Sequence, residues 1–61
     1  MKKHRAFIAY HWDDFTALET DVKNAGGDLY SVASGHPRLL EEAGSFAELE
    51  KVFGMYKRMR R

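Results

Sequence analysis

Two histidines and an aspartate in this sequence could take part in chemistry. His11 and Asp13 lie in the segment YHWDD, residues 10–14, and His36 lies in the later segment SGHP. Two imidazoles and a carboxylate can bind zinc with an open coordination position, and a histidine oriented by an aspartate can act as a general base. A spacing of two residues has little specificity, and an aspartate can equally well cap a helix. We therefore expect no enzyme, no cofactor and no catalytic or metal site. Weak metal binding by these three side chains is left open.

The elements that would position these residues are predicted to form a β-α-β unit. Residues 5–12, RAFIAYHW, are rich in aromatic and β-branched side chains, which is typical of a strand. Asp13 or Asp14 then caps a helix that ends at the sequence NAGG, residues 24–27. One face of this helix is apolar: Phe15, Leu18, Val22 and Ala25. Residues 28–34, DLYSVAS, are predicted as a second strand, parallel to the first.

Two helices are predicted in the second half of the chain. Pro37 suits the first position of a short helix that Gly44 ends. Ser45 and Glu48 have the spacing of a capping box. An apolar stripe follows: Phe46, Leu49, Val52, Phe53, Tyr56 and Met59. The predicted fold class is therefore α/β, a single small domain of residues 1–61 with basic chain ends and the order β-α-β-α-α. Six residues are predicted in its core: Phe15, Leu18, Val22, Leu49, Val52 and Phe53.

The predicted sheet and the short chain both favour self-association. A short two-stranded parallel sheet leaves two open edges and is scarcely stable alone. A chain of 61 residues buries only about 60% of the surface that its unfolded state exposes. The sequence contains no cysteine, so disulfides cannot reinforce it. We therefore expect a homo-oligomer in which a second copy extends or covers the sheet.

Three aromatic residues indicate a surface for a protein partner. In the expected strand pairing, Tyr10, Trp12 and Tyr30 share a face of the sheet that few residues remain to cover. Exposed tyrosine and tryptophan rings are typical of the centre of protein interfaces. The predicted function is a small non-enzymatic protein-binding module that regulates or inhibits a partner, in analogy with miniproteins of phages and mobile elements. The opposite possibility, that the last helix covers these rings as ordinary core, is left open.

The distribution of charge supports an alternative function. The net charge is only +1, but seven of the ten basic residues lie at the chain ends. These residues are Lys2, Lys3, Arg5, Lys57, Arg58, Arg60 and Arg61. A small nucleic-acid-binding protein could combine such basic termini with exposed aromatic rings. The acidic middle of the chain, which contains all nine acids, would repel phosphates.

The apolar segments bear on localisation. No apolar run approaches the length of about 18 residues that a membrane-spanning helix needs. The first apolar run is interrupted by His11 and followed by two aspartates, unlike the apolar region of a signal peptide. We therefore expect a cytoplasmic protein that has no membrane partner.

Overall fold

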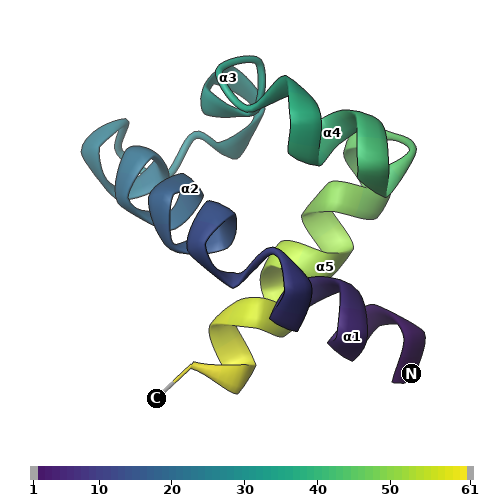
Figure 1. Cartoon of the computed structure of the whole chain (residues 1–61). Coiled ribbons are helices and arrows are strands. Elements are labelled where there is room, and N and C mark those ends of the chain that lie inside the picture. Colours follow the sequence, from purple (N-terminus) through teal and green to yellow (C-terminus); the bar gives the residue numbers. More distant parts are fainter. Residues whose placement is uncertain (1, 61) are drawn as a thin grey trace.

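The computed structural model describes residues 2–60, and the regular structure among them is entirely helical (Figure 1). The elements are α1 (Lys2–Tyr10), α2 (Trp12–Asn24), α3 (Leu29–Ala33), α4 (Pro37–Ala43) and α5 (Phe46–Met59). No strand is present in residues 2–60. The prediction of an α/β fold with the order β-α-β-α-α and a parallel sheet is therefore wrong, and the protein is a small all-α protein.

The first predicted strand is α1, and burial shows why. Alternation along a strand would place Ile8 and Tyr10 on the same face. In the structure Ile8 is completely buried, whereas Tyr10 is 84% exposed. The residues that face the rest of the protein are His4, Phe7, Ile8 and His11, and they recur at the spacing of a helix. The aromatic and β-branched composition of residues 5–12 therefore predicted a strand where the chain is helical.

The second predicted strand, residues 28–34, is helix α3 with its N-cap. The carboxylate of Asp28 accepts hydrogen bonds from the backbone N–H of Ser31 at 3.2 Å and from the Ser31 hydroxyl at 2.7 Å. These bonds lower the pKa of Asp28 below its ordinary value of 3.8. The inward face of α3 has helical spacing: Leu29, Val32 and Ala33. An aspartate followed three residues later by a serine was the signal for a cap, which the strand interpretation missed.

Helix α2 confirms a predicted helix but not its predicted cap. The helix begins at Trp12, and His11 occupies the N-cap position without a side-chain capping bond. Asp13 and Asp14 lie in the first turn, where their negative charge complements the helix dipole. The expectation that one of them is the N-cap is therefore wrong by two or three positions.

The glycines predicted to end α2 do so through a Schellman motif. The amide of Gly27 donates to the carbonyl of Val22 at 2.8 Å, and the amide of Gly26 donates to that of Lys23 at 3.2 Å. Both glycines have positive φ angles, 73° and 94°, which residues with a Cβ atom adopt only with strain. This pattern satisfies two carbonyls at the end of the helix.

The two C-terminal helices are confirmed at their boundaries. Pro37 is the first residue of α4, and Gly44 ends it with a φ angle of 101°. Ser45 caps α5 by accepting a hydrogen bond from the amide of Glu48 at 3.2 Å. The carboxylate of Glu48 bonds to His4 instead of returning to the cap, so half of the predicted capping box is present.

The helices surround one apolar core, to which α5 contributes most. The buried residues are Ile8, Phe15, Leu18, Ala33, Leu39, Leu49, Val52, Phe53 and Tyr56. Five of the six predicted core residues are among them, and the sixth, Val22, is half-buried against this core. Helix α5 packs against α1, α3 and α4, and in Figure 1 α1 crosses it near its middle.

The all-helical fold removes one reason for self-association. Without a sheet, no open strand edges need to be covered among residues 2–60. The other reason, the small core of a short chain, is unaffected, so a homo-oligomer stays a prediction. None of the helices between residues 2 and 60 combines the length and apolar character that crossing a membrane requires.

Candidate binding site

His11, Asp13 and His36 do not meet. His11 is 8% exposed and its Nε2 atom lies 2.7 Å from a carboxylate oxygen of Glu42. His36 bonds to Asp21 at 2.6 Å, whereas Asp13 is exposed in the first turn of α2. Within the described part of the chain, no three histidine, aspartate or glutamate side chains are arranged to hold a metal ion. The metal site that the sequence left open is therefore not assembled by these three residues.

Each histidine instead joins two parts of the fold through a carboxylate. His4 of α1 bonds to Glu48 of α5 at 2.7 Å. His11, between α1 and α2, contacts Glu42 of α4, and His36, before α4, contacts Asp21 of α2. Sequence reasoning missed all three pairs. Their partners are distant along the chain, so no local pattern could indicate them.

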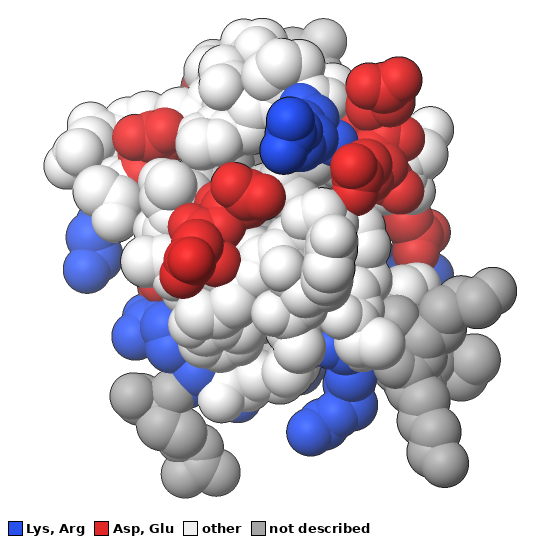
Figure 2. All heavy atoms as spheres, viewed as in Figure 1, with Lys and Arg blue, Asp and Glu red and all other residues white. Residues whose placement is uncertain are grey.

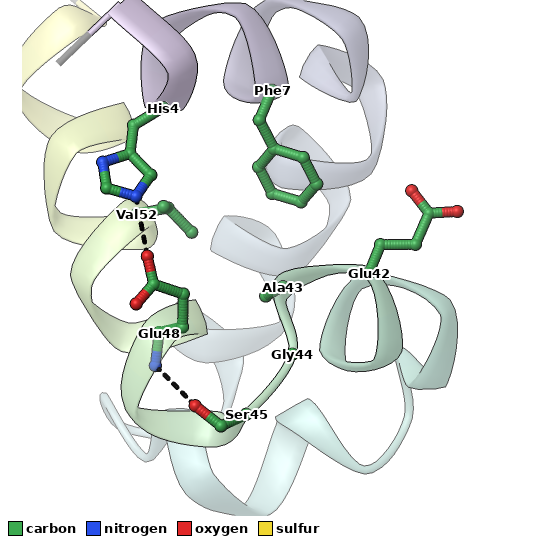
Figure 3. Close-up of a pocket in the computed structure, with 8 residues that line it drawn as sticks. All are labelled: His4, Phe7, Glu42, Ala43, Gly44, Ser45, Glu48 and Val52. Carbon is green, nitrogen blue, oxygen red and sulfur yellow. Dashed lines mark hydrogen bonds and ion pairs between the residues drawn. The ribbon is translucent and has the colours of Figure 1, made fainter.

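A hollow in the described surface lies between α1 and the turn from α4 to α5 (Figure 3). It has a volume of about 400 Å³. Its apolar wall consists of Phe7, Ala43 and Val52, and its ionisable edge consists of His4, Glu42 and Glu48. The backbone of Gly44 and Ser45 forms the rest of its rim. We call it the α1–α5 cavity.

The three aromatic residues predicted to bind a partner occupy different places. Tyr10 is 84% exposed at the end of α1, where its ring packs edge-on against His11. Trp12 is half-buried, and its ring centroid lies 4.7 Å from that of Tyr56. Tyr30 is 73% exposed on α3. Because the shared sheet face does not exist, the structure does not bring these rings together as the sequence analysis expected.

Tyr30 forms its own surface with residues that sequence reasoning did not select. Its ring packs edge-on against that of Phe46, with centroids 5.2 Å apart. A groove of about 360 Å³ runs beside this pair, between α3, α4 and the start of α5. The described residues that line it carry no charge: Tyr30, Ser31, Ala33, Ser34, Leu40 and Phe46. We call it the Tyr30 groove.

The basic residues of the chain ends differ in their availability. The side chains of Lys2, Lys3 and Arg61 lie outside the described part of the structure. Arg5 and Arg58 are exposed, Lys57 lies over the Phe53 ring at 5.1 Å, and Arg60 bonds to Glu19. On the face that Figure 2 shows, most of the described lysine and arginine atoms lie in the lower part, and most of the acidic atoms lie in the upper part.

Glu19 anchors the end of α5 to α2. Its carboxylate accepts hydrogen bonds from the Tyr56 hydroxyl at 3.1 Å and from the Arg60 guanidinium. Partial burial alone would raise the pKa of Glu19. The bonds from Arg60 and Tyr56, together with the charge of Arg60, outweigh that effect and lower its pKa below the ordinary value of 4.5. Arg60 is therefore partly neutralised as a ligand for an anionic partner.

We expect Glu19 to contribute to stability at neutral pH and to lose that contribution in acid. A carboxylate whose pKa is lower in the folded state stabilises the protein above its unfolded pKa, and protonation through the lower folded pKa removes the effect. Urea denaturation should show that the free energy of unfolding differs most between the wild type and the Glu19→Gln variant at pH 7. The difference should shrink as the pH falls below 4.5. An equal difference at pH 7 and at pH 2 would contradict this role.

Comparison with known proteins found no matching family model, no significantly similar curated protein and no significantly similar solved structure. The function is therefore inferred from the surfaces of the protein itself.

Proposed function

We propose that this protein is a small non-enzymatic binding module that regulates or inhibits a partner protein in the cytoplasm. The observation that supports this proposal is the exposed ring of Tyr30, held against Phe46 beside an uncharged groove. A ring whose position is already fixed loses little conformational entropy on binding. Tyrosine is also among the residues most often found at the energetic centre of interfaces.

The other two aromatic residues suit this role less well. Most of the Trp12 surface is already buried, and its ring contacts Tyr56. Tyr10 is more exposed than Tyr30, but it lines none of the described hollows. The partner surface is therefore assigned to Tyr30, Leu40 and Phe46, which together could receive an apolar side chain.

Nucleic-acid binding is the second candidate, and one observation favours it. Because α1 packs against α5, exposed bases from both ends of the chain, Arg5 and Arg58, belong to packed neighbouring helices. The described basic atoms that are visible in Figure 2 also lie mostly in its lower part. Such an edge could follow a phosphate backbone, although the pairing of Arg60 with Glu19 weakens it.

A comparison of three variants separates the two functions. Tyr30→Ala removes the groove ring, Tyr10→Ala removes an equally large exposed ring elsewhere, and a third variant neutralises Lys57, Arg58, Arg60 and Arg61. The tagged proteins are used to isolate partners from the native host, and the eluates are analysed by mass spectrometry and for nucleic acid. The captured partner is then purified and its affinity for each variant is measured directly.

We expect Tyr30→Ala to weaken binding of the purified partner by more than about 10-fold, as loss of a central interface ring does. Tyr10→Ala should bind like the wild type. The charge variant should change mainly the association rate. If only the charge variant loses binding, and the lost ligand is DNA or RNA held with a steep salt dependence, the nucleic-acid function is correct instead.

A further inference from the structure

The α1–α5 cavity combines an apolar, aromatic wall with an acidic edge. Its volume of about 400 Å³ lies within the usual range of ligand pockets. In Figure 3 the ring of Phe7 projects from α1 toward the turn between α4 and α5, with Glu48 on one side and Glu42 on the other. An aromatic wall flanked by two carboxylates suits a guest that is both cationic and able to pack against a ring.

Both carboxylates are held in place and keep binding capacity. One oxygen of Glu48 bonds to Nε2 of His4, and one oxygen of Glu42 contacts Nε2 of His11. Within the described part of the chain, the second oxygen of each glutamate accepts no hydrogen bond. The two side chains are 34% and 45% exposed, so a guest can reach them. Orientation by histidine reduces the entropy that each glutamate would lose on binding.

The charge of the cavity is set by these glutamates. Among the side chains that the structure describes, no lysine or arginine lines it. The C-terminal end of α4 and the N-terminal end of α5 meet at its rim, so the partial charges of the two helix dipoles oppose each other. The cavity therefore favours a cation, in contrast to the uncharged Tyr30 groove.

We propose that the α1–α5 cavity binds an arginine side chain of the partner protein. This inference rests on the proposed function, since it names a residue that the partner must present. Arginine fits better than lysine because its planar guanidinium stacks on an aromatic ring and is less strongly hydrated. Its several N–H donors can bond to a free carboxylate oxygen at the edge of the cavity.

The test uses three short peptides and the complete chain labelled with ¹⁵N. The peptides are acetyl-Gly-Arg-Gly-amide, the same peptide with citrulline, which is a neutral analogue of arginine, and the same peptide with lysine. Amide chemical shifts are followed by NMR to millimolar peptide concentrations. With the arginine peptide we expect saturable chemical-shift changes centred on Phe7, Gly44 and Ser45. The citrulline peptide should bind with an affinity at least about 10-fold lower. The lysine peptide should bind with an intermediate affinity.

Matched variants assign the effect to the cavity. Glu48→Gln retains an acceptor for His4 and should weaken arginine binding about 3- to 5-fold, as loss of a partly exposed ion pair does. Glu41→Gln removes the same charge from an exposed position on α4 outside the cavity and should leave binding unchanged. Circular dichroism confirms that both variants are folded. Equal loss in both variants, equal binding of citrulline, or shifts spread over the whole acidic surface would overturn the proposal.

The outcome is distinguishable from failure of the proposed function. If the arginine peptide does not bind while Tyr30→Ala still releases the partner, only the arginine site is wrong. If arginine binds but the partner is insensitive to Tyr30→Ala, the proposed function is wrong at its main surface. If Glu48→Gln converts a dimer into a monomer in sedimentation, the arginine comes from a second copy, which overturns the assignment to a partner protein.

Discussion

Replacing Tyr56 with alanine is expected to unfold most of the protein. Tyr56 is completely buried. The centroid of its ring lies 4.7 Å from that of Trp12, 5.5 Å from that of Phe15 and 6.1 Å from that of Phe53. Removing a buried aromatic side chain from a core destabilises a protein by about 3–5 kcal/mol. A chain this short has little more stability than that to lose. Circular dichroism at 222 nm during heating should show weak helicity and no cooperative transition.

The Tyr56→Phe variant is the matched control. It keeps the ring contacts and removes the hydroxyl, which donates to Glu19 and lies 3.3 Å from Thr16. A hydrogen bond of this kind contributes about 0.5–1.5 kcal/mol, or up to about 3 kcal/mol to a charged acceptor. This variant should therefore remain folded with a lower midpoint. A Tyr56→Ala variant that melts at the wild-type temperature would contradict the packing of α5 against α2.

Replacing Leu18 or Leu49 with alanine should each lower the free energy of unfolding by about 2–5 kcal/mol. Both side chains are completely buried, one on α2 and the other on α5. The cost combines the lost transfer free energy with the cavity that remains, so it depends on how far the core can collapse. Urea denaturation followed by circular dichroism measures it.

Leu29→Ala provides the comparison for these two variants. Leu29 is half-buried at the start of α3, so the same chemical change should destabilise the protein less. If all three variants lose the same free energy, or none loses any, the burial pattern described above is wrong.

The sequence predicted the helices whose ends are marked by specific residues. Gly26 and Gly27, Pro37 and Ser45 act as expected at the ends of α2, α4 and α5. Such signals work because they satisfy backbone groups locally, independently of the rest of the fold. The apolar stripes of α2 and α5 also contain six buried residues, and five of them were predicted in the core.

Helices α1 and α3 were mistaken for strands because they are short, and the N-cap signal of Asp28 before α3 was missed. A short apolar run does not distinguish a strand from a helix by periodicity alone. In a strand, Ile8 and Tyr10 would lie on the same face, whereas in a helix they lie on different faces. The burial of Ile8 and the exposure of Tyr10 in the structure show that the helix is correct. The prediction of a sheet then led to the expectation that Tyr10, Trp12 and Tyr30 share one face.

The candidate sites depend on contacts between residues far apart in the chain. Tyr30 was selected from the sequence as an exposed ring, but its contact with Phe46 requires α3 to pack on α5. The pair of His4 and Glu48 spans 44 positions, and the α1–α5 cavity exists only once α1 lies across α5. Local propensity contains no information about such distances.

The placement of so much of the core on the last helix has a consequence for biosynthesis. Helix α5 supplies Leu49, Val52, Phe53 and Tyr56, and it contacts α1, α3 and α4. A nascent chain that ends before residue 46 would expose Ile8, Phe15 and Leu18 without the surface that buries them. Such exposed apolar groups are targets for chaperones and aggregation. Productive folding must therefore wait until α5 has left the ribosome, and chains interrupted earlier should be rapidly degraded.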